Sequence, residues 1–122
     1  MCCLFSRAWV QPWLLNYLAP TRDPSVTTFV SIGTGPGTSG DVRADSLENF
    51  KKIFGMNVLG IYGSEDTKRV KGNMKNHESI GKKIHGSRYQ TIKIDGANHF
   101  YQGKQDVLVK IVSDWIGKFS AQ

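Results

Sequence analysis

Three short apolar segments recur along the chain, each followed by a glycine or an Asp-Gly pair. They cover residues 26–32, 57–62 and 89–94, and the first of them is rich in β-branched side chains. Apolar runs of this length, bounded by turn residues, are typical of buried β-strands. The pattern therefore predicts three strands, with short connections at their carboxyl ends.

Segments with helical periodicity separate these strands. A short helix is expected at about residues 13–18, and a second at 46–54, which is acidic early and basic late as the helix dipole favours. A third is expected at 70–84, with three apolar side chains facing inward, namely Met74, Ile80 and Ile84. The clearest helix, at 104–119, carries one apolar stripe made of Val107, Leu108, Ile111, Val112, Trp115, Ile116 and Phe119.

Alternation of helices with strands predicts an α/β fold in which helices cover a parallel sheet. We expect a partial three-layer α/β sandwich with about three parallel strands. The 122 residues suit a single domain spanning residues 1–122. With 39% hydrophobic and 21% charged residues, the composition is that of a globular protein.

Other compositional features bear on the surroundings of the protein. No run of 18 apolar residues occurs, so no membrane-spanning helix is expected. The two cysteines are adjacent, Cys2 and Cys3, and cannot form a disulfide framework. We therefore expect a reducing, cytoplasmic location.

A net charge of +6 is concentrated in one stretch. Residues 68–93 hold eight basic side chains against the single acidic residue Glu78. We call this stretch the basic face. A solvated helix face that keeps the protein soluble is the favoured interpretation, and binding to an anion, RNA or an acidic surface is the alternative. Tyr89 is the one aromatic residue among these lysines and arginines, which argues against nucleic-acid binding.

A glycine-rich stretch at residues 33–40 follows the first predicted strand, where a phosphate-binding loop would lie. It lacks a Gly-Lys-Ser/Thr ending, and Pro36 removes one backbone N–H donor. We interpret it as a flexible loop between a strand and a helix. With no other cofactor-binding motif in the chain, no cofactor is expected.

Two polar residues follow neighbouring strands at equivalent places. Asp66 comes just after residues 57–62, and His99 just after residues 89–94. Because the carboxyl ends of parallel strands share one edge of a sheet, we expect the two side chains to lie side by side. An acid bonded to one imidazole nitrogen leaves the other nitrogen free to act as a base. Asp66 could instead cap the following helix, and Glu65 could compete for its role.

These motifs resemble the carboxyl-terminal part of an α/β-hydrolase. In that family a Tyr/His-Gly-x-x-Asp motif supplies the triad acid, as at Tyr62 to Asp66, and a Gly-x-x-His loop supplies the base, as at Gly96 to His99. The final amphipathic helix matches as well, and residues 14–32 resemble the helix and strand that follow the nucleophile. The resemblance implies a triad acid at Asp66, a triad base at His99 and hydrolysis of an ester or related acyl bond.

A Gly-x-Ser-x-Gly nucleophile elbow, which such a hydrolase needs, is absent from the sequence. Ser6 is at a suitable distance before the first helix but lacks both elbow glycines, so we interpret it as a plain polar residue near a frayed terminus. No nucleophile is assigned. We expect an amino-terminally truncated, esterase-like chain that is inactive alone.

The alternative is a non-catalytic module that binds a partner or an anion, through an open sheet edge or through the basic face. We expect the strand at 26–32 to lie at an unprotected edge of the sheet and to favour homo-oligomers.

Overall fold

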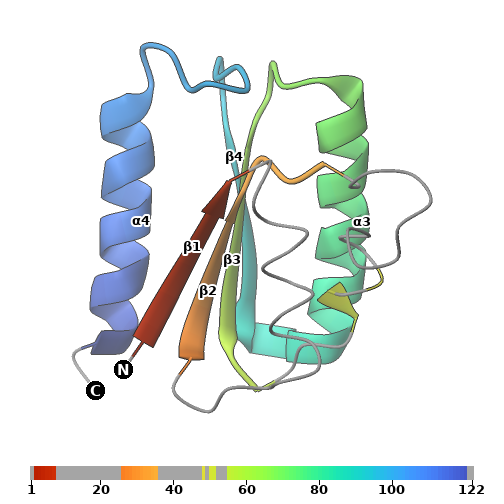
Figure 1. The fold of residues 1–122 in the computed structure, drawn as a ribbon, viewed down its shortest axis with the longest axis vertical. Helices are drawn as coiled ribbons and strands as arrows, with labels where there is room; N and C mark the ends of the chain where they lie inside the picture. The colour runs from red at the N-terminus through yellow and green to blue at the C-terminus, as the bar shows by residue number, and fades with distance from the viewer. Residues whose placement is uncertain (1, 8–25, 36–47, 49, 52–54, 121–122) are drawn as a thin grey trace.

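Four parallel strands form the sheet of this computed structural model, which describes residues 2–7, 26–35, 48, 50–51 and 55–120. The strands are β1 (Cys2–Arg7), β2 (Val26–Ile32), β3 (Asn57–Gly63) and β4 (Tyr89–Ile94). Their order in the sheet, β1-β2-β3-β4, is also their order along the chain, as Figure 1 shows. All four carboxyl ends therefore point to the same edge.

The predicted α/β class, with parallel strands and covering helices, is confirmed, and the sheet contains one strand more than the sequence suggested. β1 was not predicted, because its six residues lack a turn boundary before them and merge with the apolar segment that follows. β2 pairs with β1 on one side and with β3 on the other, so the expectation that it lies at an edge is wrong. Among the residues that the structure describes, the strand at that edge is β1.

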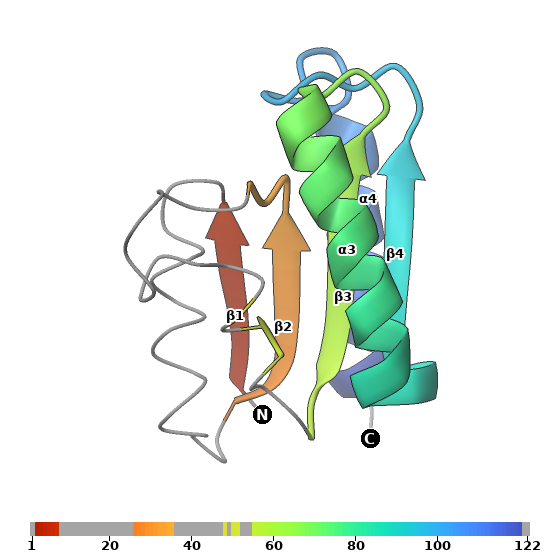
Figure 2. The same cartoon turned by 90° about the vertical axis from the view of Figure 1, so that its right-hand side faces the viewer.

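Helices α3 (Lys68–His85) and α4 (Gln105–Ser120) lie on opposite faces of the sheet, where both cover β3 and β4 (Figures 1 and 2). A short 3-10 helix, η2 (Gly86–Arg88), leads from α3 into β4. Both helices were predicted from their apolar periodicity. Neither has the length and apolar character needed to cross a membrane, and no other helix in the described residues does either.

Two other predicted helices fall on residues that the structure describes only in part. The helix at about residues 13–18 lies outside the described residues. Of the segment 46–54, only residues 48, 50 and 51 are described, and Glu48 and Phe50 are helical.

One cluster of buried apolar residues lies between α4 and the sheet. Alternate residues of β2, β3 and β4 face α4 because side chains alternate between the two faces of a strand. The buried members of this cluster are Val30, Ile32, Leu59, Ile61, Ile94, Ala97, Tyr101 and Trp115. On the other face, a smaller cluster of Tyr62, Val70 and Met74 holds α3 against the sheet.

Two apolar residues that were expected to face inward are exposed. Ile84 in α3 is 37% exposed and Val107 in α4 is 44% exposed. In α3 the neighbouring residue His85 is buried instead of Ile84. The residues that are buried in this helix therefore cannot be identified from their hydrophobicity alone.

Candidate active site

Asp66 and His99 are in direct contact at the carboxyl edge of the sheet. The imidazole Nδ1 of His99 lies 3.0 Å from Asp66 Oδ1 and 3.0 Å from Asp66 Oδ2. Asp66 follows β3 and His99 follows β4, the two paired strands at one side of the sheet. The contact predicted from their equivalent positions is confirmed.

Burial makes the two ends of this pair unequal. The side chain of Asp66 is fully buried, whereas that of His99 is 28% exposed. A carboxylate can only accept hydrogen bonds. In the contact with the Asp66 carboxylate, His99 Nδ1 therefore carries a hydrogen and donates the hydrogen bond. In the neutral imidazole, Nε2 then carries the lone pair. The pair thus joins a partly exposed imidazole to a carboxylate that is shielded from water.

The turn after β3 keeps Asp66 available for His99. Thr67, not Asp66, is the N-cap of α3, and its Oγ1 accepts the Val70 backbone N–H at 3.2 Å. The Asp66 carboxylate accepts a hydrogen bond from the Thr67 backbone N–H at 2.7 Å. The backbone N–H of Asp66 donates to the Gly63 carbonyl at 3.2 Å. The alternative that Asp66 serves as the helix cap is therefore wrong. These bonds fix the carboxylate from the backbone side.

The turn after β4 fixes His99 in a similar way. Asn98 Oδ1 accepts the backbone N–H groups of Phe100 at 3.0 Å and Gln102 at 3.3 Å, so the loop folds around the asparagine side chain. Tyr101 has a positive φ of 57° and is buried under the loop. Phe100 is 70% exposed, and its ring packs edge-on against the ring of His99, with the ring centres 5.5 Å apart. His99 therefore lies beside an exposed aromatic surface.

Gly33 is a part of this site that the sequence did not reveal. It directly follows β2 and has a φ of 59°, and its N–H donates to the Ile61 carbonyl at 2.8 Å. A Cβ at this position would lie 3.5 Å from both Asp66 Oδ2 and the His99 ring. The glycine-rich stretch was interpreted only as a flexible loop, and residues beyond 35 are outside the described part of it. The signal that could have pointed to Gly33 in the sequence was its position directly after a predicted strand.

Ser6 lies in β1, so its interpretation as a residue of a frayed terminus is wrong. It is aligned with Ser31 of β2, and the following Arg7 is aligned with Ile32. The carboxyl end of β1 thus lies one strand spacing, about 4.8 Å, from the end of β2 and Gly33.

The basic face is confirmed as a solvent-facing surface along α3, η2 and β4. Seven of its eight basic residues are exposed, and Lys71 is half-buried. Lys82 pairs with Glu78 at 2.9 Å, one helical turn away, and Lys71 donates to the Ser64 carbonyl at 3.2 Å. These contacts fit the interpretation of a solvated helix face.

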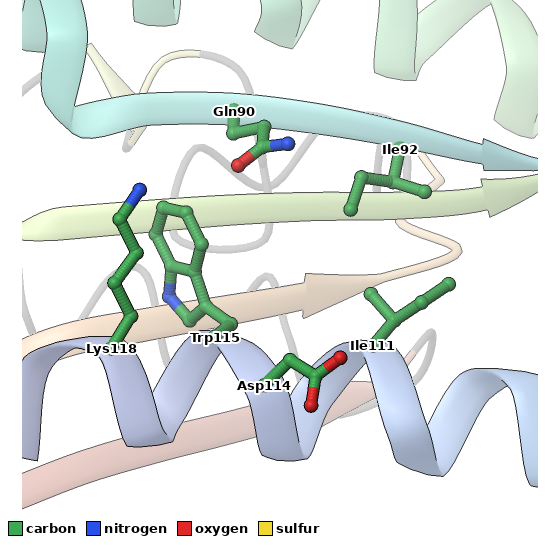
Figure 3. Close-up of a pocket in the computed structure, with 6 residues that line it drawn as sticks. All are labelled: Gln90, Ile92, Ile111, Asp114, Trp115 and Lys118. Carbon is green, nitrogen blue, oxygen red and sulfur yellow. The ribbon is translucent and has the colours of Figure 1, made fainter.

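A shallow groove of about 220 Å³ lies elsewhere, between β4 and α4. Figure 3 shows its lining residues, which are Gln90, Ile92, Ile111, Asp114, Trp115 and Lys118. The ammonium of Lys118 lies 5.7 Å from the centre of the Trp115 ring, a distance suited to a cation–π contact. The groove shares no residue with the Asp66–His99 pair and holds no comparable pair of acid and base.

Two further histidines are buried in α3, on the side of the sheet away from α4. His77 stacks on Phe50, with ring centres 4.4 Å apart, and His85 lies 6.5 Å from the ring of Tyr89. Burial, with a further contribution from the Arg88 charge, lowers the pKa of His85 below its ordinary value. No group of three or more metal-ligating side chains is found in the part of the chain that the structure describes.

Of the comparisons with known proteins, only the one with solved structures finds a match, and that match bears on the fold alone. No family model and no curated protein matches the chain. The structure is similar to that of a protein of unknown function from Agrobacterium tumefaciens, described as a candidate α/β-hydrolase, with a TM-score of 0.64 and 23% identity. The match covers 96% of this chain and 50% of that one, so this chain spans about half the length of its structural neighbour. The chain thus has an α/β-hydrolase-like fold.

Proposed function

We propose that this chain supplies the acid and base of an acyl-ester hydrolase, with His99 as the base and Asp66 as its support. The observation that carries the proposal is the contact of His99 Nδ1 with both oxygens of a fully buried carboxylate. The likeness to the Agrobacterium tumefaciens protein supports the same class of fold. A cytoplasmic, esterase-type activity would suit the adjacent cysteines, which favour a reducing compartment.

Acyl transfer at this pair would begin with a serine hydroxyl attacking the ester carbonyl. His99 Nε2 would take the hydroxyl proton and later pass it to the leaving alcohol. Asp66 would hold the Nδ1–H and stabilise the imidazolium that forms. The described residues show no nucleophile elbow, so the attack on the ester carbonyl needs a serine held in such a turn.

Glycines placed around Ser6 provide the first test. The double substitution Leu4→Gly and Ala8→Gly restores the Gly-x-Ser-x-Gly pattern at the end of β1, which lies one strand away from Gly33. We expect this variant to react with a fluorophosphonate probe at Ser6. Labelling that His99→Ala and Ser6→Ala both abolish would support the proposal, whereas labelling that is independent of His99 would contradict it.

Nuclear magnetic resonance tests the pair directly in the unaltered chain. We expect His99 to carry its proton on Nδ1, with a downfield proton signal that His99→Ala removes. A His99 ring protonated on Nε2 at neutral pH would rule out the proposed base. Circular dichroism of each variant controls for loss of fold.

A further inference from the structure

Ser64 joins the loop of Asp66 to the loop of His99. Its Oγ accepts the backbone N–H of Gly96 at 2.7 Å, across 32 residues of sequence. We propose that Ser64 is a positioning residue, whose bond to Gly96 helps to hold His99 against Asp66. The inference rests on the proposed function and adds to it a residue that touches neither member of the pair.

Ser64 is itself fixed at its backbone. Its N–H donates to the Ile94 carbonyl at 3.0 Å, and its carbonyl accepts the Lys71 ammonium at 3.2 Å. These bonds tie Ser64 to the end of β4 on one side and to α3 on the other. Its hydroxyl oxygen is therefore presented to the Gly96 loop from a defined point.

Gly96 offers its N–H because the turn that contains it does not use that group. The turn closes through the Ala97 N–H, which donates to the Ile94 carbonyl at 3.3 Å. Gly96 occupies the third position with a φ of 77°, a conformation that favours glycine in such turns. The hydrogen bond to Ser64 thus gives the Gly96 N–H an acceptor that the turn itself does not provide.

Loss of the hydroxyl would alter the site more than the fold. Gly96 is exposed, so water can replace the serine as acceptor. The loops would stay joined through the bond from the Glu65 N–H to the Ala97 carbonyl, 2.9 Å long. His99, three residues beyond Gly96, would then be held less firmly against the buried carboxylate.

The test compares Ser64→Ala with Ser64→Thr, which keeps a hydroxyl, and with Glu65→Ala, which removes an exposed side chain from the same loop. The readout is the exchange of the His99 Nδ1 proton with water. We expect exchange to become about fivefold faster in Ser64→Ala, the factor that corresponds to one ordinary hydrogen bond. Ser64→Thr and Glu65→Ala should exchange at the wild-type rate.

Hydrogen exchange of the Gly96 amide in the unaltered chain gives a second measurement. Its protection, despite the exposure of Gly96, supports the inference even where Ser64→Ala fails to fold, and an unprotected amide overturns it. A wild-type His99 signal that Ser64→Ala leaves unchanged overturns this inference alone. A wild-type chain without that signal overturns the proposed function as well, so the two failures are distinguishable.

Discussion

The α-carbon of Gly63 packs directly against the carbonyl group of Ala97. A Cβ at position 63 would fall on the Ala97 carbonyl oxygen and lie 2.7 Å from its carbonyl carbon. Gly63 ends β3 and Ala97 lies two residues before His99, so this contact sets how closely the two loops approach. No side chain can be inserted there without separating them.

Gly63→Ala should therefore destabilise the protein and disturb the Asp66–His99 contact together. We expect the free energy of unfolding to fall by about 1–3 kcal/mol, the usual effect of overpacking, and the His99 Nδ1 proton signal to weaken. Gly81→Ala is a matched control, because its Cβ would overlap the Tyr89 ring far from the pair. It should destabilise without changing the His99 signal, and an unchanged signal in Gly63→Ala would contradict the prediction.

A second prediction concerns the tautomer of His99. In Asp66→Asn, the side-chain amide can donate to Nδ1, which moves the ring proton to Nε2 and removes the base. We expect the ¹⁵N chemical shifts of His99 to show that the ring proton has moved from Nδ1 to Nε2. In the variant with glycines around Ser6, Asp66→Asn should lower kcat on the order of 10⁴-fold, as loss of the acid does in a serine protease. Retention of the wild-type tautomer would show that Asp66 does not orient the ring.

The unaltered chain should show no appreciable esterase turnover. Loss of a nucleophile removes on the order of a million-fold in kcat from a serine hydrolase. Hydrolysis of p-nitrophenyl acetate should therefore be the same in the wild type and in Ser6→Ala. Activity that survives purification and disappears in Ser6→Ala would show that this serine acts without elbow glycines.

Association through β1 is the fourth expected outcome. This strand has a partner on one side only among the described residues, and unpaired N–H and C=O groups at a sheet edge favour pairing with another chain. Light scattering should give a mass above 13.6 kDa that rises with concentration. A monomer mass at every concentration would mean that this edge is closed.

Proline substitutions in β1 test whether that edge carries the association. Successive N–H groups of a strand point to opposite sides within the sheet, so of Leu4→Pro and Phe5→Pro one should unpair β1 from β2 and the other should only weaken association. Val109→Lys, at a 62% exposed position of α4, should leave the mass unchanged.

Acid should destabilise the fold through His85. Burial holds the pKa of this imidazole below the ordinary value of 6.5, so the unfolded chain binds more protons than the folded one as the pH falls. Its contribution to stability is complete above pH 6.5 and is lost progressively below that value. The unfolding midpoint in urea should drop more steeply between pH 7.5 and 5.5 in the wild type than in His85→Phe. Equal slopes would show that another group controls the acid response.

The sequence predicted the parts of the fold that depend on apolar periodicity, and with them the position of the pair. Asp66 and His99 could be placed because each follows an apolar strand, and parallel strands bring such positions together. The buried side of α3 could not be predicted, since Asn73, His77 and His85 take inward positions that hydrophobicity assigns to the surface. Asn73 is accommodated by its bond to the Thr34 carbonyl at 3.1 Å, a contact across 39 residues.

Strand order along the chain has a consequence for synthesis. Each strand of β1-β2-β3-β4 is added beside the one made before it, so the sheet can be extended from one side as the chain emerges. Asp66 is added to the growing chain 33 residues ahead of His99, before β4 and α4 have been made. The carboxylate is therefore produced before the strand and helix that bury its surroundings, and its imidazole partner arrives with the last third of the chain to be translated.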